Sequence, residues 1–195
     1  ACAGGQATPD APAPTRPTGP HVMVAAANPL AVEAGLKVLR AGGSAIDAAV
    51  AVQGVLALVE PQSSSLAGGS YMVFYDARTR QVTAYDGRET APAAADAEWF
   101  FGRDGKPLPF FTAVTSGRST GVPGAIAMLA MAQKDHGKLA WSQLFGDGIR
   151  LAEEGFPVGG RLGRMANNAP QARQPDATAY FTKPDGTRIQ LGDTL

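Results

Sequence analysis

The stretch Ala45-Ile-Asp-Ala-Ala-Val-Ala-Val-Gln-Gly-Val-Leu-Ala-Leu-Val59 decides the fold class of this chain. As a helix it is apolar on nearly all sides, and Ser44 precedes it in capping-box order with Asp47. Pro61 ends the helix, because proline lacks the N–H group that a further turn needs. The run is too short and too often interrupted by polar residues to cross a bilayer. We therefore expect a helix buried between layers of secondary structure.

Upstream of this helix, the sequence predicts a strand followed by an amphipathic helix. The apolar run at residues 21–27 is typical of a buried strand. Asn28 and Pro29 then supply a helix cap and a proline for the first turn, and Gly42-Gly43 supplies the stop. The two helices thus follow one another closely, separated by a glycine turn.

Downstream, two β-prone runs and two further helices are predicted. Residues 71–75 and 81–85 are separated by a short polar connection, which predicts a β-hairpin with two largely apolar faces. Helices are expected over residues 125–134 and 141–154. Helices on either side of an apolar hairpin, without regular strand–helix alternation, favour an α+β layered sandwich.

Composition excludes several classes of function. The chain has 195 residues, of which 45% are hydrophobic and 17% charged, as expected for a packed globular domain. The formal net charge of +0 gives no electrostatic support for nucleic-acid binding. The single cysteine, Cys2, cannot form an intrachain disulfide, and His21 and His136 are too far apart to suggest a zinc site. We expect no metal and no cofactor.

Residues 1–20 are rich in proline, alanine and glycine and are expected to form a flexible leader, with the fold beginning near His21. Within this leader, Ala1-Cys2-Ala3-Gly4-Gly5 resembles the lipidation region of a bacterial lipoprotein. This favours the periplasm or cell envelope, with a possible lipid anchor at Cys2. A lone thiol in a flexible tail is the alternative interpretation.

Arg88 is the candidate binding residue. It leaves the end of a predicted buried strand, and Pro92 holds the following backbone extended. A guanidinium held in this way can bind a carboxylate through two parallel hydrogen bonds, as recognition of an amino-acid substrate requires. From the residues alone, a structural ion pair with Glu89 or Asp86 is favoured over substrate binding.

Three other features are interpreted as structural. The serine and glycine residues of 63–69 lack the lysine of a phosphate-binding loop and form a connection. Glu153 and Glu154 are adjacent on a helix and cannot face one site, so they form a solvated helix end. His136 ends a predicted helix, where a cation stabilises the last carbonyl groups.

Eight short segments in order along residues 22 to about 160 resemble the γ-glutamyltransferase family. They are Val24-Ala-Ala-Ala27, Asn28-Pro-Leu-Ala31, Leu39-Arg-Ala-Gly-Gly43, Ala45-Ile-Asp-Ala-Ala49, Val59-Glu-Pro-Gln-Ser63, Asp86-Gly-Arg-Glu-Thr-Ala-Pro92, Gly121-Val-Pro-Gly124 and Glu153-Glu-Gly-Phe-Pro157. The resemblance implies an N-terminal nucleophile hydrolase with a four-layer α-β-β-α sandwich. Residues 21–195 would be the N-terminal, incomplete segment of its large subunit.

In this family a precursor cleaves itself, and a threonine exposed at the start of the small subunit becomes the nucleophile, with its own α-amino group as base. It takes the γ-glutamyl group from a donor such as glutathione and passes it to water, an amino acid or a peptide. No threonine here matches that position, neither Thr90, Thr112, Thr115, Thr120 nor Thr194. The resemblance therefore assigns no catalytic residue to this chain.

One family residue can be carried over. Arg88 resembles the arginine that binds the α-carboxylate of the glutamyl group. Glu89 is expected either to orient Arg88 or the adjoining loop, or to have an ordinary structural role. Asn28 and Ser44 replace residues usual in the family, and Ala67 narrows a more glycine-rich loop. We expect a segment of a γ-glutamyltransferase that is inactive alone. The alternatives are a non-catalytic fragment or binding module for γ-glutamyl compounds, and an amidohydrolase like the cephalosporin acylases.

Overall fold

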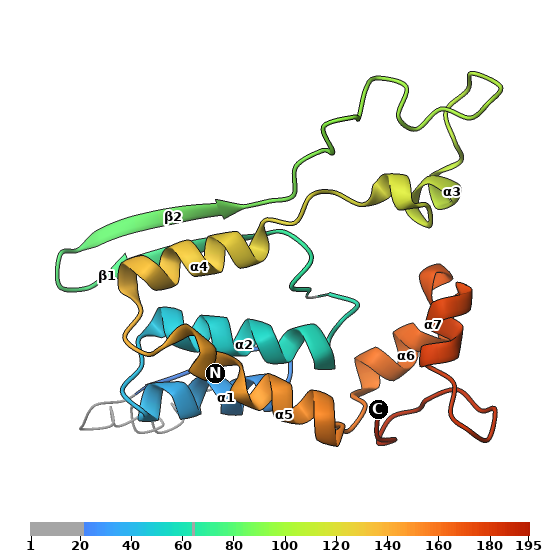
Figure 1. Ribbon diagram of the computed structural model, residues 1–195. Helices are drawn as coiled ribbons and strands as arrows, with labels where there is room; N and C mark the ends of the chain where they lie inside the picture. The colour runs from blue at the N-terminus through green and yellow to red at the C-terminus, as the bar shows by residue number, and fades with distance from the viewer. Residues whose placement is uncertain (1–21, 64) are drawn as a thin grey trace, which may run out of the picture.

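The computed structural model describes residues 22–63 and 65–195; the leader expected at residues 1–20, with Cys2 and His21, lies outside the described residues. Figure 1 shows a layer of helices on a two-stranded hairpin, a long excursion beyond the hairpin, and small helices near the C-terminus. The α+β class expected from the sequence is what the structure has.

Helices α1 (Pro29–Arg40) and α2 (Ala45–Val59) form the first part of the helical layer. The Asn28 side chain accepts a hydrogen bond from the Leu30 N–H at 3.0 Å and so caps α1. Gly42, with φ of 88°, provides the left-handed turn between the two helices. The predicted capping box is confirmed, since Ser44 and Asp47 exchange hydrogen bonds of 2.8 and 3.1 Å.

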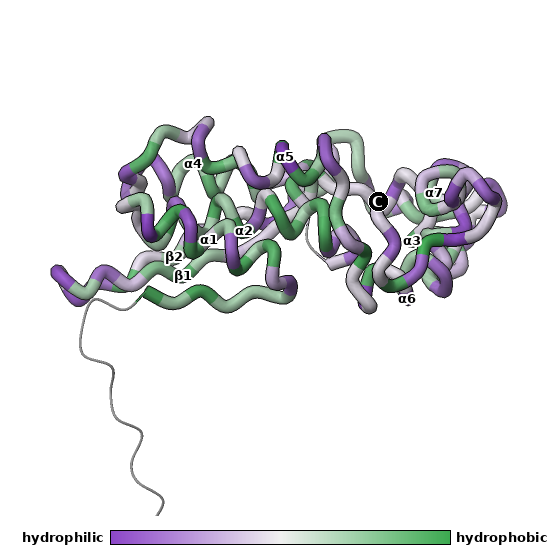
Figure 2. The backbone as a smooth tube through the Cα atoms, turned by 90° about the horizontal axis from the view of Figure 1, so that it is seen from below, coloured by the Kyte–Doolittle hydropathy of each residue, from purple (hydrophilic) through white to green (hydrophobic). Residues whose placement is uncertain are grey.

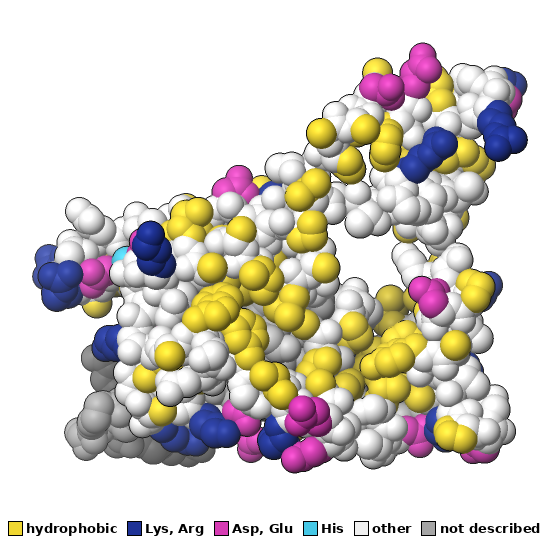
Figure 3. Space-filling model, in the orientation of Figure 1, with side chains coloured by type: hydrophobic (Ala, Val, Ile, Leu, Met, Phe, Trp, Pro, Cys, Tyr) yellow, Lys and Arg dark blue, Asp and Glu magenta, His cyan; other side chains and the backbone are white. Residues whose placement is uncertain are grey.

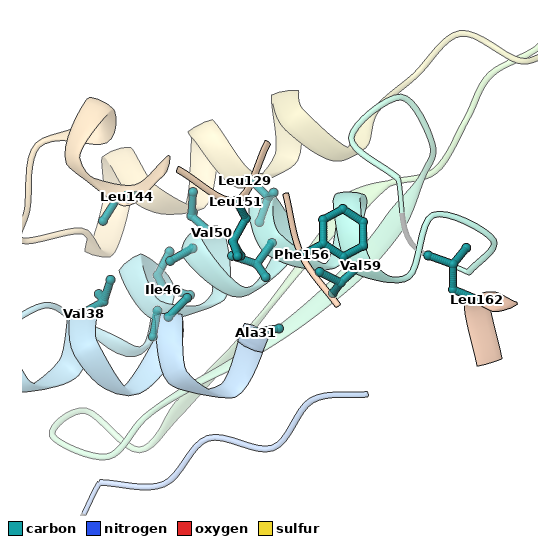
Figure 4. Packing of buried hydrophobic residues seen from close by; sticks show 14 of the residues in the cluster. Ala31, Val38, Ile46, Val50, Val59, Leu129, Leu144, Leu151, Phe156 and Leu162 are labelled. Carbon is teal, nitrogen blue, oxygen red and sulfur yellow. The ribbon is translucent and has the colours of Figure 1, made fainter. Parts of the chain in front are cut away.

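The core forms around α2, as its apolar surface requires. Figure 4 shows Ile46, Val50 and Val59 of α2 among side chains from the other helices and from the chain after them. The partners come from α4 (Ala125–His136) and α5 (Gly146–Glu154), with Leu129 and Leu151 both buried. The helix therefore lies between neighbours on several sides, as predicted.

The predicted hairpin is confirmed. Strands β1 (Ser70–Asp76) and β2 (Gln81–Gly87) pair antiparallel, with Tyr71 opposite Asp86 and Tyr75 opposite Val82. Met72 and Phe74 point to the helical layer, and the Phe74 ring lies 4.2 Å from the ring of His136 at the end of α4. His136 lies in the last turn of α4 and packs on the hairpin through its ring, and its stabilisation of the last carbonyl groups stays a prediction. Figure 2 shows α1, α2 and α4 on the same side of the hairpin.

The strand predicted at residues 21–27 is wrong for its described part. Residues 22–27 lie outside any helix or strand, and Val22 and Met23 are 51% and 88% exposed. A strand requires a neighbour for its backbone groups, and the sheet formed by the described residues consists of β1 and β2 only.

The helix predicted over residues 141–154 is divided. A 3₁₀ turn, η2 (Trp141–Phe145), leads into α5, because Gly146 and Gly148 weaken a continuous α-helix there. Beyond α5 come elements that the sequence pattern did not predict. They are α6 (Gly160–Asn168), η3 (Pro170–Arg173) and α7 (Pro175–Tyr180). None of the described helices is long and apolar enough to traverse a membrane.

The chain between β2 and α4 makes an excursion away from the helical layer (Figure 1). We call residues 91–120 the excursion; it contains α3 (Phe110–Val114) and the 3₁₀ turn η1 (Gly117–Ser119). In Figure 3 an opening lies between the helical layer, the excursion and the C-terminal helices. The excursion begins at Ala91, close to Arg88 in the sequence, so its first residues form part of the candidate site.

Candidate substrate-carboxylate site

Two glycines allow the end of β2 and the start of α4 to approach closely enough to place Arg88. A Cβ atom on Gly124 would lie 2.6 Å from the Gly87 carbonyl oxygen, and one on Gly87 would lie 2.6 Å from Met128. Beyond this contact, Thr90 and Val122 exchange backbone hydrogen bonds of 3.2 and 2.8 Å. Arg88 therefore lies on backbone fixed at both sides.

Neighbouring residues orient the Arg88 side chain without using all of its hydrogen-bond donors. One guanidinium nitrogen, Nη2, lies 3.1 Å from Glu89 Oε2, and the guanidinium carbon lies 5.9 Å from the centre of the Tyr71 ring. The side chain remains 54% exposed. Asp86 accepts from the Arg88 backbone N–H at 2.9 Å rather than from its side chain. The fork keeps donors that face solvent and can receive a carboxylate.

Glu89 links Arg88 to the loop before β1. Its Oε1 accepts from the Gly69 N–H at 2.9 Å while its Oε2 faces Arg88. The N–H of Glu89 itself lowers the pKa of its carboxyl group, and the Gly69 N–H and the charge of Arg88 lower it further against the opposing effect of burial. Glu89 is thus an anion. It contacts both Arg88 and the loop, the two partners that the sequence offered as alternatives.

The loop of residues 65–69 is more than a connection. The Gly68 carbonyl accepts from the N–H groups of Gly124 and Ala125 at 3.2 and 3.0 Å, which satisfies two donors at the start of α4. Sequence reasoning missed this role, although the glycine pair next to a strand was a usable signal for close backbone approach.

A cavity of about 540 Å³ extends from Arg88 into the excursion. Arg88, Glu89 and Pro92 line one side, and Trp99 and Arg118 line another. Trp99 and Arg118 were not selected from the sequence, because nothing in their spacing shows that the two limbs of the excursion meet. An arginine fork, an oriented carboxylate and an aromatic wall suit a small anionic ligand.

The remaining polar features lie elsewhere. Glu154, at the exposed end of α5, pairs with Arg150 at 3.1 Å, in agreement with a solvated helix end. In the part of the chain that the structure describes, no group of three or more His, Cys, Asp or Glu side chains could hold a metal ion.

Comparisons with known proteins agree with this architecture. The family model described as gamma-glutamyltranspeptidase matches residues 31–195. The glutathione hydrolase proenzyme of Bacillus subtilis (strain 168) is 41% identical over 177 residues, which cover 91% of this chain and 30% of that protein. Among solved structures, Helicobacter pylori gamma-glutamyltranspeptidase superposes with a TM-score of 0.83 at 32% identity, over 92% of this chain and 52% of that one.

The helical layer on one face of an apolar hairpin, together with these structural neighbours, defines an α+β protein of the N-terminal nucleophile hydrolase class. The chain belongs to the γ-glutamyltranspeptidase family. It spans 23% to 30% of the length of this and similar curated relatives, and it aligns with their N-terminal portion. A cephalosporin acylase from Bacillus halodurans is also similar in fold, with a TM-score of 0.70 at 26% identity.

Proposed function

We propose that this chain contributes the carboxylate clamp of a γ-glutamyltransferase that also acts as a glutathione hydrolase. The observation that carries the proposal is the Arg88 fork, which is held by Glu89 and Tyr71 but still presents donors to an adjoining cavity. The α-carboxylate of a γ-glutamyl donor such as glutathione matches this fork in shape and charge.

In the proposed reaction, the nucleophile is a threonine on a small subunit cut from the same precursor. Its Oγ forms a bond to the γ-carbonyl carbon, the C–N amide bond breaks, and the threonine α-amino group carries the proton to the leaving amine. Water or an amino group then attacks the acyl-enzyme. Arg88 fixes the far end of the glutamyl group, and this binding keeps the γ-carbonyl at a constant distance from the threonine.

The hairpin supports the proposed subunit partner. Its outer face carries Tyr71, Val73, Tyr75 and Val82, which are 57–73% exposed, and no described element covers it. A contiguous apolar sheet face of this kind marks an interaction surface. In a four-layer sandwich the second sheet packs on this face.

The edge of β1 gives further support. A cavity of about 490 Å³ is lined by residues 23–25 on one side and residues 70–73 of β1 on the other, with α2 behind. Among the described residues β1 pairs with β2 along one edge, and its other edge has no paired strand there to satisfy its N–H and C=O groups. We propose that a strand of the small subunit lies along this edge.

Denaturing mass spectrometry of the purified enzyme tests the subunit proposal. We expect a second chain whose N-terminal residue is threonine, together with release of the amine from a γ-glutamyl anilide. This 20.0 kDa chain alone would be inactive in that assay. A single chain that binds L-glutamate without turnover would instead identify a binding module.

The role of Arg88 is tested by Arg88→Lys in the processed enzyme. Lysine keeps the charge but cannot form two parallel hydrogen bonds, so kcat/KM for the anilide should fall about tenfold to a hundredfold, mainly through KM. Arg78→Lys, at the exposed hairpin turn, is the matched control and should leave KM unchanged. Equal KM values for the Arg88→Lys and parent enzymes would remove Arg88 from the site.

For localisation, we propose the periplasm or cell envelope, with a lipid anchor on Cys2. The small residues around Cys2 support this, and Cys2 lies outside the described residues. Cells fed a labelled fatty acid should incorporate the label into the parent protein and not into Cys2→Ala. Equal labelling of the two proteins would contradict the anchor.

A further inference from the structure

The two limbs of the excursion are joined by reciprocal hydrogen bonds between Trp99 and Arg118. The Trp99 Nε1–H donates to the Arg118 carbonyl oxygen at 2.8 Å. In return, Arg118 Nη1 donates to the carbonyl oxygens of Trp99 and Phe101 at 3.0 and 2.8 Å. We call this set of three bonds the clasp.

The clasp is the second of two ties between the limbs. The first is the backbone pair of Thr90 and Val122 at the base of the excursion. Between the two ties, the Arg88 cavity opens, with Trp99 and Phe100 as its aromatic wall. The clasp therefore determines how far this wall stands from the limb that carries Arg88.

Arg118 holds the two limbs together through hydrogen bonds to carbonyl groups rather than through an ion pair. Within residues 22–63 and 65–195, no carboxylate lies within 4.0 Å of its guanidinium. Two carbonyl oxygens from one limb converge on a single nitrogen, while its own carbonyl receives the indole N–H. The three bonds lie at the exposed surface of an irregular loop, where the planar arginine fork supplies donors at fixed angles.

We propose that the clasp positions the aromatic wall of the Arg88 cavity and thereby sets the affinity for the γ-glutamyl group. This inference rests on the proposed function. Trp99 and Arg118 are positioning residues, since they act on the bound glutamyl group through the cavity shape and not on the scissile amide. Their loss should weaken substrate binding more than it slows the chemical step.

The test uses the processed enzyme with Trp99→Phe and Arg118→Met. Trp99→Phe keeps an aromatic ring but removes the indole donor, and Arg118→Met keeps an unbranched chain but removes the guanidinium. For both variants, KM for a γ-glutamyl anilide should rise about fivefold while kcat stays within about twofold of the parent value. The KM of Arg118→Lys should lie between the values of the parent and of Arg118→Met, because lysine can still donate to one carbonyl group. Arg103→Met, an exposed arginine of the same excursion, is the control and should match the parent.

Two inhibitors separate positioning from a general loss of structure. The inhibition constant of L-glutamate should rise with KM in both clasp variants, whereas that of 4-aminobutyrate, which lacks the α-carboxylate, should change little. Unchanged KM in both variants, or a fall in kcat with KM constant, would overturn the clasp proposal while leaving Arg88 in place. If Arg118→Met does not fold, the KM and kcat of Trp99→Phe test the proposal by the same criteria. A parent enzyme without γ-glutamyl turnover would overturn the proposed function, and the clasp proposal with it.

Discussion

At the scale of single residues, Asp47 shows how a buried charge is used to hold the helical layer together. The side chain is fully buried, and its Oδ2 accepts from the N–H groups of Ser44 and Lys138, both at 2.8 Å. It thereby joins the start of α2 to the chain that follows α4, 91 residues away in the sequence. The capping box was predictable, but the bonds to Lys138 were not, because they depend on the packing of α4.

Asp47→Ala should destabilise the fold strongly. The substitution leaves the partly buried Ser44 and Lys138 N–H groups without their acceptor, and it should lower the free energy of unfolding by about 2 kcal/mol. Urea unfolding of the two proteins measures the difference. Glu153→Ala, on the exposed surface of α5, is the control and should change stability by less than about 0.5 kcal/mol.

The same residue makes stability sensitive to acid. Burial raises the pKa of Asp47, but hydrogen bonds from Ser44, Lys138 and Gln133 outweigh it and hold the pKa below the ordinary value of 3.8. A carboxylate with a lowered pKa stabilises the fold above that ordinary value and loses this contribution as the pH falls through the folded-state pKa. The stability difference between the parent and Asp47→Asn should therefore be largest near neutral pH and shrink below pH 3.8. A constant difference across this range would assign the acid sensitivity to other groups.

At the candidate site, sequence reasoning found Arg88 but not the side chains around it. Arg88 was identifiable from its local context and from the family resemblance. Tyr71 lies against Arg88, Trp99 lines its cavity, and Gly69 binds Glu89, so only the folded chain brings these residues together. Local sequence carries no information on contacts of this kind unless the topology is known.

At the scale of elements, the loop before β1 holds the site through a contact that only glycine permits. A Cβ atom on Gly69 would lie 2.5 Å from Glu89 Oε2 and 2.7 Å from the Glu89 backbone nitrogen. Glu89 would have to move, and Arg88 would lose its oriented partner.

Gly69→Ala should consequently reduce kcat/KM of the processed enzyme for a γ-glutamyl anilide roughly tenfold, because small displacements of a binding group are costly. Gly117→Ala is the matched control, since a Cβ atom there meets nothing within 4 Å. Circular dichroism should show that both variants keep the parent helix content. Parent-like kinetics for Gly69→Ala would show that Glu89 does not need its present position.

The elements that were predicted correctly are those whose signals are local. Helices α1 and α2 begin at capping residues, and the hairpin follows from two apolar runs around a polar turn. The strand prediction for residues 22–27 was wrong because a strand needs a neighbouring strand for its backbone hydrogen bonds. The short helices α6 and α7 were missed because each contains too few turns to give a clear apolar period.

At the scale of the whole molecule, the described helices cover only one face of the hairpin. These helices lie on the inner face of the hairpin (Figure 2). The outer face of β1 and β2 carries exposed apolar side chains. Arg88 lies beside Tyr71, at one end of this outer face. A partner that covers this face would therefore also lie next to Arg88, and the proposed nucleophile of the small subunit would reach a substrate bound at the proposed carboxylate clamp from this side.

Val73→Lys tests this relation between subunit packing and catalysis. Val73 lies near the middle of the outer face and is 73% exposed here, so lysine should be tolerated by this chain alone. Under a second sheet the same ammonium group would be buried without a partner, at a cost of several kcal/mol. Size-exclusion chromatography should show loss of the two-subunit complex, and activity should fall in proportion to it. Gln81→Lys, at the exposed start of β2, adds the same charge outside the apolar cluster and should leave both unchanged. An intact, active complex carrying Val73→Lys would mean that this face remains open to solvent in the mature enzyme.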